Sequence, residues 1–567
     1  MAPVASGRSA AGTNGSANGA AASYSGPVNP TAARHEERET IRVHSPNVTY
    51  SDDAISTRYQ YHQTHVETIE KPDGKKEFVA TPNVETYDFK TKTKVPKTGL
   101  MLVGLGGNNG STIAAMVMAN RHNLSWHTKE GVQTPNYYGS IVRASTIRLG
   151  MDPKTGKDVN VPFSNVLPMV HPNDFVLGGW DISSMPVDQA MVRAKVLEYD
   201  LQRTVAPYVQ DLKPLPSIYY PDFIAANQEE RADNQIPGKD KAAHVEHIRN
   251  DIRQFKQQNG LDQVIVVWTA NTERYSDIIA GVNDTADNLL ASIKQSHSEV
   301  SPSTIFAVSC ILEGVPFVNG APQNTFVPGA VELAERHRAF IAGDDLKTGQ
   351  TRYKTAVIDF LVNAGIKPLS VASYNHLGNN DGHNLNAPAQ FRSKEISKSS
   401  VIDDAVEASH LLYPRKQGKD GKVEVDKPAH CVVIKYMPPV GDQKVAIDDF
   451  TSELAMGGRN TIYTVNQCAD STLASPIILD LAILAEFMTR ISYAKPGHAD
   501  AAVKEEEYSG LYSILSLLSY SLKAPLAKPG TDVVNSLTRQ RAAVTNFLRA
   551  LVGLQPESDL LLERRVW

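Results

Sequence analysis

Cysteine is scarce in this 567-residue chain, which contains only Cys310, Cys431 and Cys468. None of them forms a Cys-x-x-Cys pair, so the sequence indicates neither a zinc knuckle nor a disulfide framework. Three reduced and mostly buried thiols are the ordinary interpretation of such a set. This usage favours a reducing compartment, and we expect the protein to be cytoplasmic.

Long apolar runs are also missing, since no stretch of 18 apolar residues occurs in the sequence. The richest segment, PIILDLAILAEFM, is interrupted by Asp480 and Glu486 and predicts a buried helix. The N-terminal segment lacks the apolar core of a signal peptide and has few arginines for a transit peptide. Its Ala, Ser, Gly and Asn cannot bury enough surface to offset ordering entropy, so we predict a disordered tail over residues 1–38.

A strong charge imbalance is absent as well, because the formal net charge is only −5. Neither nucleic acid nor an anionic membrane surface is therefore expected as a partner. Hydrophobic residues make up 41% of the chain and charged residues 21%, which is the composition of an ordinary globular protein.

The pattern along the chain predicts an α/β fold. Between residues 97 and 351, apolar runs such as LMLVGL, NDFVLGGWDIS, VIVVWTANTER and STIFAVSCILEG alternate with helix-length segments, as in a parallel sheet. Residues 39–96 mix charges with β-formers and predict short strands separated by turns. The last hundred residues predict mainly helices, including one over YSGLYSILSLLSYSLK and a final arginine-bearing helix.

VGLGGNNGST is the sharpest local signal. Gly104 and Gly106 follow an apolar strand and precede a predicted helix capped by Ser111, the context of a dinucleotide fingerprint. Glycines let the backbone approach a pyrophosphate, which binds at the helix N-terminus. The later glycine, Gly110, comes one position late, and Asp181 at the end of a later strand replaces the expected acid. An acid there favours NAD over NADP, although a glycine turn without a ligand remains the alternative.

Seven motifs, the glycine loop among them, together carry a family resemblance. They are GLGGNNGST, WTANTER, NGAPQNTFVPG, GDDLKTGQT, SYNHLGNNDG, FRSKEISKSSVIDD and LKAPL. With these motifs, the chain from about residue 60 onward resembles the inositol-3-phosphate synthase (myo-inositol-1-phosphate synthase) family of eukaryotic type. The tail and the loop 414–428 match less well.

The resemblance implies a Rossmann NAD-binding domain interrupted by an α+β catalytic and tetramerisation domain, with C-terminal helices returning to the Rossmann domain. The expected divisions are a tail (1–38), a β-rich segment (39–96), the NAD-binding domain (97–351), the catalytic domain (352–472) and a C-terminal helical part (473–567). A homotetramer is implied, and no metal is expected.

The implied activity is conversion of D-glucose 6-phosphate to 1D-myo-inositol 3-phosphate, the first step of inositol biosynthesis and a supply for phospholipid biosynthesis. A C–H beside an alcohol is not acidic, but oxidation at C5 by NAD makes the neighbouring C6 acidic. The resulting enolate attacks the C1 aldehyde, and the hydride then returns to C5. Because negative charge develops on the C5 and C1 oxygens, the site needs cations and donors at both.

Four lysines of the matching motifs are candidates for those cations. By resemblance, Lys394 is expected to shuttle a proton at the C5 oxygen, and Lys523, at the end of the predicted apolar helix, to stabilise its charge. Lys444 is expected at the C1 oxygen, and Lys398 at the substrate phosphate. Clustered and desolvated lysines have lowered pKa values. A solvated surface charge is the ordinary alternative for any one of them.

The resemblance extends to further site residues. The catalytic set also includes Asp345 and Asn379, and the substrate-binding set comprises Lys398, Asn375 and Asp470. The expected cofactor-binding residues are Gly104, Gly106, Gly107, Asn108, Asn109, Asp181, Ser217, Ile218, Gln228, Arg231, Thr269, Ala270, Asn271, Thr272, Gly320, Ala321, Asp345, Thr348, Asn379, Asn380, Asp381, Lys394, Gly441, Asp442, Asp470 and Ser471.

Several alternatives stay open at this level. A lysine could form a Schiff base in aldol chemistry, although a ketone made by NAD already serves as electron sink. His376 and His383 are weak evidence for a metal, because no third ligand lies nearby in sequence. Another NAD-dependent sugar-phosphate oxidoreductase or epimerase would share the glycine loop without needing the lysines. An NAD-binding regulatory protein with a lost active site is disfavoured because all four lysines are present.

Overall fold

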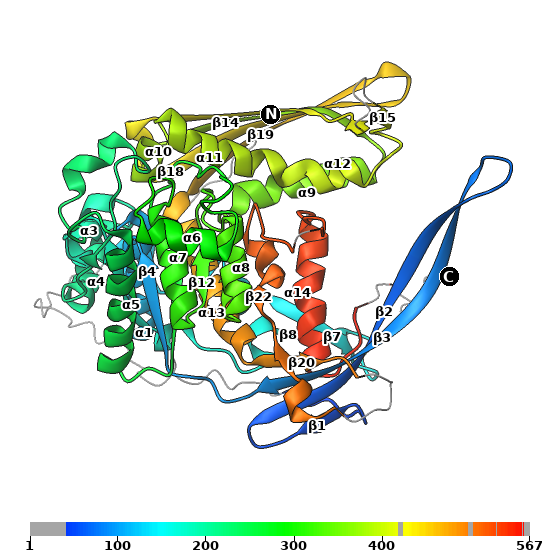
Figure 1. Ribbon diagram of the computed structural model, residues 1–567, viewed down its shortest axis with the longest axis horizontal. Coiled ribbons are helices and arrows are strands. Elements are labelled where there is room, and N and C mark those ends of the chain that lie inside the picture. The colour runs from blue at the N-terminus through cyan, green and yellow to red at the C-terminus, as the bar shows by residue number, and fades with distance from the viewer. Residues whose placement is uncertain (1–40, 418–422, 497–502, 529, 558–559, 561–567) are drawn as a thin grey trace, which may run out of the picture. The chain divides into compact units, whose positions relative to one another are not determined.

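The computed structural model describes residues 41–417, 423–496, 503–528, 530–557 and 560 (Figure 1). The predicted disordered tail, residues 1–38, lies outside the described residues. The elements that position the site belong to three sheets.

A seven-stranded sheet in which every neighbouring pair is parallel forms the centre of the fold. In spatial order its strands are β10 (Leu215–Pro216), β9 (Val176–Asp181), β4 (Thr98–Val103), β11 (Gln263–Trp268), β12 (Phe317–Asn319), β13 (Phe340–Ala342) and β22 (Ser513–Ile514). The predicted Rossmann-type α/β fold is thereby confirmed, and β4 and β11 lie side by side at the point where the strand order reverses.

Both faces of this sheet are buried, which explains the continuous apolar runs in the sequence. Along β4, Leu100 and Leu102 pack into one hydrophobic cluster, whereas Met101 and Val103 pack into the other. The first face is covered by α1 (Asn108–Arg121), α3 (Val187–Ala194), α4 (Tyr199–Val209) and α13 (Asp470–Thr489). The second is covered by α5 (Lys241–Gln258), α6 (Ala286–Lys294), α7 (Pro302–Glu313) and α8 (Pro328–Arg336).

Helix α13 is the element that the sequence predicts as a buried helix. By length and composition it could cross a membrane, but 83% of its most apolar window is buried inside the fold. Asp480 and Glu486 lie within it, and both are fully buried. The helix is therefore part of the core.

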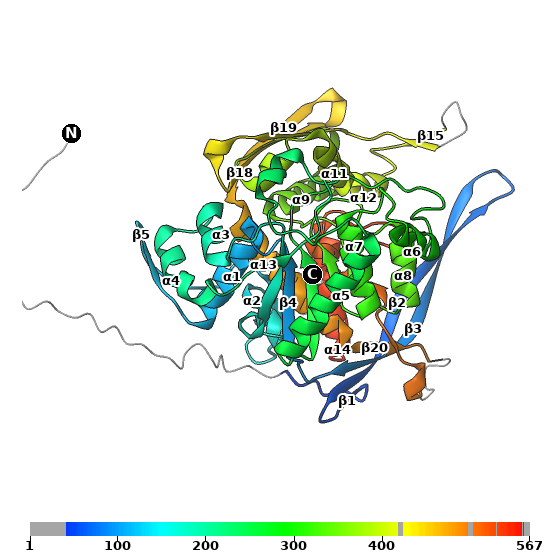
Figure 2. The same cartoon turned by 60° about the vertical axis from the view of Figure 1, so that its left-hand side comes forward.

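A second sheet of four strands lies over one edge of the first. Its order is β17 (Ala429–Tyr436), β14 (Lys367–Leu377), β18 (Gln443–Glu453) and β19 (Arg459–Ala469). One face of it packs on α9 (Gly349–Asn363), α10 (Asn380–Asn384), α11 (Pro388–Ser399) and α12 (Asp403–Glu407) (Figures 1 and 2). Buried and half-exposed residues alternate along β18, as expected of a sheet covered on one face.

The N-terminal segment forms long strands, so the prediction of short strands separated by turns is wrong. Strands β2 (Ala54–Glu70) and β3 (Lys76–Lys92) pair over their whole length in a hairpin whose tip lies away from the other elements (Figure 1). Pro82 is tolerated because only β2 pairs with that part of β3, which leaves its other edge free. The remaining strands of this sheet are β1 (Val48–Tyr50), β20 (Ile491–Ala494) and β21 (Ser509–Gly510).

Two further assignments from periodicity are corrected. STIFAVSCILEG forms helix α7, which begins at Pro302 with Ser301 as a hydrogen-bonding cap, and the strand that follows is β12. YSGLYSILSLLSYSLK is not a helix: it supplies β22 and a 3₁₀ turn over Ser516–Ser521. Its backbone hydrogen-bonds to the central sheet, since Leu515 N–H donates to Ile341 O at 2.9 Å. The predicted arginine-bearing helix is present as α14 (Leu537–Leu551).

The remaining elements are short and lie outside these layers. They are the hairpins of β5 (Trp126–Thr128) with β6 (Gly131–Gln133), β7 (Thr146–Met151) with β8 (Asp158–Pro162) and β15 (Arg415–Gln417) with β16 (Val423–Val425), and helix α2 (Ile141–Ala144).

Candidate active site

The glycine loop connects β4 to α1 and approaches the next strand closely. Gly104 has φ 99°, and a Cβ there would lie 2.8 Å from the backbone N and Cα of Ala270. A Cβ on Gly110 would lie 2.5 Å from Gly104 O. Gly110 therefore sits in the first turn of α1 and lets that turn pack against the loop, which accounts for its late position in the motif.

The N-terminus of α1 differs from the predicted one. The helix begins at Asn108 with Gly107 as its cap residue, so the prediction that Ser111 caps it is wrong. Ser111 lies inside the helix, and its hydroxyl donates to Gly107 O at 2.8 Å. The backbone N–H groups of the first turn are left without a side-chain cap, as an anion-binding helix start requires.

Asp181 lies where the sequence predicts it, at the end of β9 beside the glycine loop. Its carboxylate is buried, accepts from Ser183 N–H at 3.0 Å and pairs with Arg231 at 3.4 Å. A Cβ on Gly106 would lie 3.3 Å from this carboxylate. The glycine cradle, the bare helix start and this acid fit the pyrophosphate and ribose of NAD.

One cavity joins the central sheet to the second sheet and brings most of the predicted residues together. They line it from the carboxyl ends of the parallel strands and from the start of α13. The predicted residues that line it are Gly104, Gly107, Asn108, Asn109, Asp181, Ser217, Ile218, Arg231, Thr269, Ala270, Asn271, Thr272, Gly320, Ala321, Asp345, Thr348, Asn379, Asn380, Asp381, Lys394, Lys444, Asp470, Ser471 and Lys523.

Six predicted residues do not line the cavity, namely Gly106, Gln228, Asn375, Lys398, Gly441 and Asp442. At least two of them contact residues that do. Gln228 accepts from Asn271 at 2.9 Å and from Asn380 at 3.0 Å. Asp442 accepts from the N–H of Ser471 at 2.9 Å and from its hydroxyl at 2.8 Å.

The lining residues that sequence reasoning missed are mostly apolar. They are Val103, Ile182, Ile224, Trp268, Pro322, Leu346 and Ala474. Several adjoin predicted polar residues along the chain, but an apolar side chain carries no chemical signal of its own. Only the three-dimensional path of the cavity identifies them.

Asp345 is shared by two lysines. One of its oxygens accepts from Lys394 at 2.9 Å and from Lys523 at 3.1 Å, while the other accepts from Ser397 at 2.6 Å. Lys523 N–H also donates to Asp345 O at 2.7 Å, which fixes the lysine by its backbone. Lys523 thus follows Leu522, which is extended just after the 3₁₀ turn, and does not end a helix as predicted.

Burial and mutual charge shift the pKa values of these three residues in different directions. Burial opposes ionisation of Asp345, but Lys394 and Lys523 outweigh it and hold its pKa below the usual value. Burial likewise opposes the charge on Lys394, yet Asp345 and Asp381 raise its pKa. For Lys523, burial dominates and lowers the pKa to about 7. Lys523 is therefore the member that exchanges a proton near neutrality.

Lys444 forms a second, looser pair with Asp470 at 3.5 Å. Asp470 is the first residue of α13, and its other oxygen accepts from Asn379 at 3.4 Å. Burial opposes ionisation of Asp470, but Lys444 and Lys394 hold its pKa below the usual value. This pair lies in the same cavity as the Asp345 trio.

Lys398 lies behind the cavity wall. Its ammonium donates to Asn375 Oδ1 at 3.2 Å, and among the described residues it has no ion pair within 4.0 Å. Burial lowers its pKa, and the charges of Lys444 and Lys354 lower it further.

The asparagine-rich segment SYNHLGNNDGHNL is structured as the end of β14 followed by α10. Asn379 caps α10, since its side chain accepts from Gly382 N–H at 2.9 Å. Asn380 donates to Asn271 at 3.2 Å. Burial raises the pKa of Asp381. The polar side chains of this segment thus bridge the two sheets at the cavity.

The WTANTER segment anchors α11, which carries Lys394, and the preceding helix α10. Ser393, its neighbour on α11, donates to Glu273 O at 2.8 Å, and Asn384 of α10 donates to Thr272 O at 2.8 Å. The Glu273 carboxylate accepts from the Ser303 hydroxyl at 2.6 Å and from Ser303 N–H at the start of α7. Sequence reasoning predicted Thr272 as a cofactor-binding residue. It did not single out Glu273, which stands in the same motif, nor Ser303, Ser393 and Asn384.

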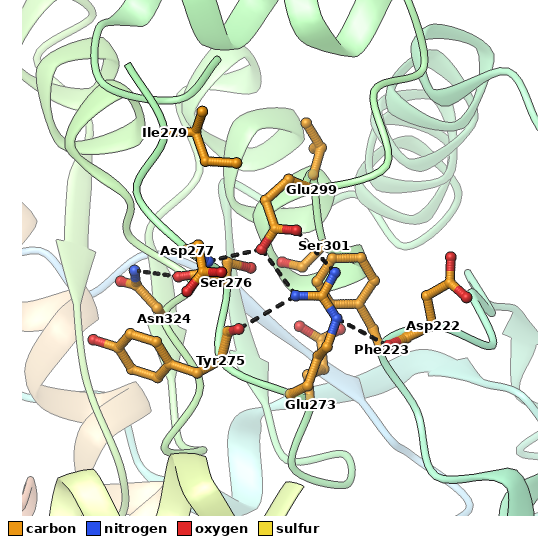
Figure 3. A network of polar contacts seen from close by, with 12 residues as sticks. Asp222, Phe223, Glu273, Tyr275, Ser276, Asp277, Ile279, Glu299, Ser301 and Asn324 are labelled. Atoms are coloured by element: carbon orange, nitrogen blue, oxygen red, sulfur yellow. Dashed lines mark hydrogen bonds and ion pairs between the residues drawn. The ribbon is translucent and has the colours of Figure 1, made fainter. Parts of the chain in front are cut away.

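A charged pair stiffens the same segment. Arg274 donates to both oxygens of Glu299, at 2.8 and 3.0 Å, and Glu299 also accepts from Asp277 N–H at 2.7 Å (Figure 3). The guanidinium lies over the ring of Phe223 at 4.0 Å. These contacts stabilise the main chain that follows Asn271, a residue that lines the cavity.

The two histidines of the asparagine-rich segment do not form a metal site. No group of three or more His, Cys, Asp or Glu residues suited to a metal ion occurs in the part of the chain that the structure describes. The His383 ring stacks on Tyr436 with centroids 4.7 Å apart.

A Rossmann-type sheet with a glycine loop at its switch point, joined to a cluster of buried lysines, defines an NAD-dependent enzyme. The model of the myo-inositol-1-phosphate synthase family matches residues 98–549. The inositol-3-phosphate synthase of Saccharomyces cerevisiae is 54% identical over 538 residues, which is 93% of this chain and 98% of that protein. Isozyme 2 of Arabidopsis thaliana is 52% identical, with 93% and 99% of the chains covered.

Comparison with solved structures indicates the same family. The crystal structure of inositol-3-phosphate synthase from Caenorhabditis elegans superposes with a TM-score of 0.87 at 49% identity, covering 93% of this chain and 99% of that one. The chain belongs to the myo-inositol-1-phosphate synthase family. It is an NAD-dependent enzyme of the isomerase class, an intramolecular lyase.

Proposed function

We propose that the chain converts D-glucose 6-phosphate to 1D-myo-inositol 3-phosphate by oxidation at C5, enolisation, aldol ring closure and re-reduction, with no net consumption of NAD. The observation that carries this proposal is the sharing of buried Asp345 by Lys394 and Lys523 in the cavity that begins at the glycine loop. The names of the close relatives support the substrate and product.

The residues around the glycine loop would hold the cofactor. Gly104 and Gly107 would give the pyrophosphate access to the start of α1, and Asp181 would accept from ribose hydroxyls. The chemistry that bound NAD would supply is reversible hydride transfer at C5. Asn380 and Asn271 lie across the cavity and offer amide groups to the nicotinamide end.

The lysines divide into a fixed charge and a proton carrier. Lys394 stays protonated, because Asp345 and Asp381 hold its proton, and it stabilises negative charge at the C5 oxygen. Lys523, with a pKa of about 7, takes the proton from the C5 hydroxyl and returns it. This reverses the division of labour expected from the resemblance, and it follows from the burial of Lys523 and from the carboxylates beside Lys394.

The remaining two lysines are assigned to two other groups of the substrate, the C1 oxygen and the phosphate on C6. Lys444, held loosely by Asp470, stabilises the C1 oxygen during ring closure. Lys398 balances the substrate phosphate, since it is a buried lysine that lacks a carboxylate of its own among the described residues. A Schiff base remains the rival use of a lysine, and borohydride trapping of substrate on the protein would favour it.

We also propose that the protein is a cytoplasmic homotetramer. The family resemblance suggests the assembly, and the low cysteine content fits a reducing compartment. The division of the chain at residues 97, 352 and 473 is likewise a proposal.

A product assay tests the activity. The purified protein is incubated with D-glucose 6-phosphate and catalytic amounts of NAD, and inositol phosphate and NADH are both measured. We expect inositol phosphate without net NADH. Net NADH would indicate a sugar-phosphate dehydrogenase instead, and the absence of any product would indicate an NAD-binding protein without activity.

A further inference from the structure

A second cluster of buried polar side chains lies on the inner face of the four-stranded sheet, behind Lys398. Lys354 of α9 donates to the hydroxyl of Ser373, which in turn donates to the carboxylate of Asp448. Its ammonium lies 3.4 Å from His430 Nε2 and 4.0 Å from Asp448 Oδ1. None of these four residues lines the cavity, and the mechanism above does not use them.

The cluster is joined to Lys398 by the sheet. Ser373 and Asn375 are two residues apart on β14 and so share a face, with Ser373 bound to Lys354 and Asn375 bound to Lys398. His430 Nδ1 lies 3.4 Å from Ser399 O, the residue after Lys398 on α11. Lys354 can thus affect Lys398 through its charge, and also through the contacts that β14 and His430 make with both lysines or their neighbours.

The charges here do not balance. Lys354 and Lys398 are both buried. Among the described residues, Lys354 has one carboxylate partner, Asp448 at 4.0 Å, and Lys398 has none. The carboxylates nearer the cavity are engaged elsewhere, Asp345 by two lysines and Asp470 by Lys444. Burying cations without partners is costly, so the arrangement is suited to a ligand that brings negative charge.

We propose that Lys354 is a positioning residue for the substrate phosphate: it repels the proton of Lys398 in the free enzyme, so that Lys398 acquires its charge only when the phosphate dianion binds. The inference rests on the proposed function, in which Lys398 faces that phosphate. It adds that substrate binding is coupled to proton uptake by the enzyme.

The charged groups that face Lys398 all lower its pKa. Lys394 on α11, Lys444 on β18, Lys354 on α9 and Lys523 all lower its pKa, after burial itself. Asn375 on β14 contributes no charge, and His430 on β17 has its pKa lowered to about 4, by burial first, so it is neutral at physiological pH. Lys354 has its pKa lowered by burial to about 8 and is mostly charged near neutrality. Its repulsion is therefore present where the enzyme works.

Proton uptake can be measured by calorimetry. The full-length, NAD-loaded protein is titrated with D-glucitol 6-phosphate, which lacks the C1 aldehyde and cannot close a ring, in two buffers of different ionisation enthalpy at pH 8. A phosphomonoester, with its second pKa near 6, is already a dianion at this pH, so uptake reports the protein. We expect the wild-type protein to take up a large fraction of one proton per ligand bound.

Lys354→Met and Lys354→Gln test the role of Lys354, and the glutamine can still donate to Ser373. Without the repulsion, Lys398 holds its proton to higher pH. Both variants should therefore take up less proton at pH 8, and the pH at which affinity falls should move upward by about 0.5 unit or more. Lys354→Arg keeps the charge and should keep the wild-type profile.

The direction of the shift separates this role from a merely structural one. Damaged packing would weaken binding equally at every pH and lower the unfolding temperature, and that result would overturn the inference. Lys241→Met is the matched control, because Lys241 is also a buried lysine but is bound to carbonyl groups of His297 and Val300 outside the cavity. It should leave the pH profile unchanged.

The same titration distinguishes the two proposals. If the wild-type protein forms inositol phosphate and binds the analogue without proton uptake, the coupling is wrong while the proposed function stands. If the wild-type protein binds no analogue and forms no product, both are wrong.

Discussion

Asp345 places two ammonium groups on a single carboxylate oxygen, and at the scale of residues this contact decides the chemistry. Reactive side chains can be identified from the motifs in which they stand. The sequence could therefore predict Lys394, Lys523 and Asp345 as members of the site. It could not show that they share one oxygen, because the partners come from positions 345, 394 and 523 of the chain. Nor could it show that their pKa shifts are opposite, because burial dominates at Lys523 whereas Asp345 and Asp381 outweigh burial at Lys394.

Lys523→Met tests the proton carrier. We expect a loss of about 100-fold or more in the rate of product formation, the range of a single general base, with NAD affinity kept. The measurement is product formation alongside NAD binding by fluorescence. Lys154→Met, at an exposed lysine, is the control and should leave both unchanged. A Lys523→Met variant with a near-normal rate would remove this lysine from the mechanism.

The pH dependence gives an independent test of the same residue. The neutral form of Lys523 is the one that accepts a proton, so the rate should fall as pH decreases through about 7. In Asp345→Asn, the attraction that raises the pKa of Lys523 is gone, so the fall should move to lower pH. A rate profile of Asp345→Asn that falls at higher pH than the wild-type profile would contradict this assignment.

At the scale of elements, the strands of the parallel sheet were predictable because they are buried on both faces and continuously apolar. The same apolarity misled the assignment of α7, whose residues 302–311 are all buried, so that no amphipathic pattern marks the helix. The segment before Lys523 was predicted as a helix for a related reason. Its strand character depends on pairing with Phe340 and Ile341, far away in sequence.

Gly110→Ala tests how closely α1 must pack on the glycine loop. Its Cβ would lie 2.4 Å from Leu105 O, and backbone there cannot move without disturbing the loop. We expect NAD affinity to fall by about tenfold or more, and the protein to lose about 1–3 kcal/mol of stability, as in overpacked sites. Isothermal titration and thermal unfolding measure the two effects.

Gly150→Ala is the matched control, since nothing lies within 4 Å of its Cβ position and its φ is not positive. It should leave both quantities unchanged. Equal NAD affinity in the Gly110→Ala variant and the wild-type protein would show that the loop tolerates the methyl group.

At the scale of the whole molecule, the four-stranded sheet leaves one face partly apolar and exposed. Tyr463 and Val465 of β19 are each 72% exposed, and Tyr374 and Ile447 are exposed nearby on β14 and β18. A row of exposed apolar side chains on a sheet often marks a protein contact. The proposed tetramer would cover it, and composition alone could not have located this face.

Tyr463→Asp combined with Val465→Asp tests that assembly. Two charges on this face should shift the proposed tetramer to smaller species, because a charge buried without a partner is costly. Light scattering after size-exclusion chromatography gives the mass of wild type and variant. An unchanged tetramer would place the contact elsewhere, and NAD binding serves as the check on folding.

The path of the chain through Lys523 has a consequence for synthesis. Lys523 is fixed by its backbone to Asp345, and β22 adds the last strand beside β13, so the final sixty residues complete a sheet begun near residue 98. A polypeptide that stops before this segment would keep the glycine loop but would lack Lys523, the proposed proton carrier. Only a chain translated through this segment can therefore carry out the proposed proton transfer.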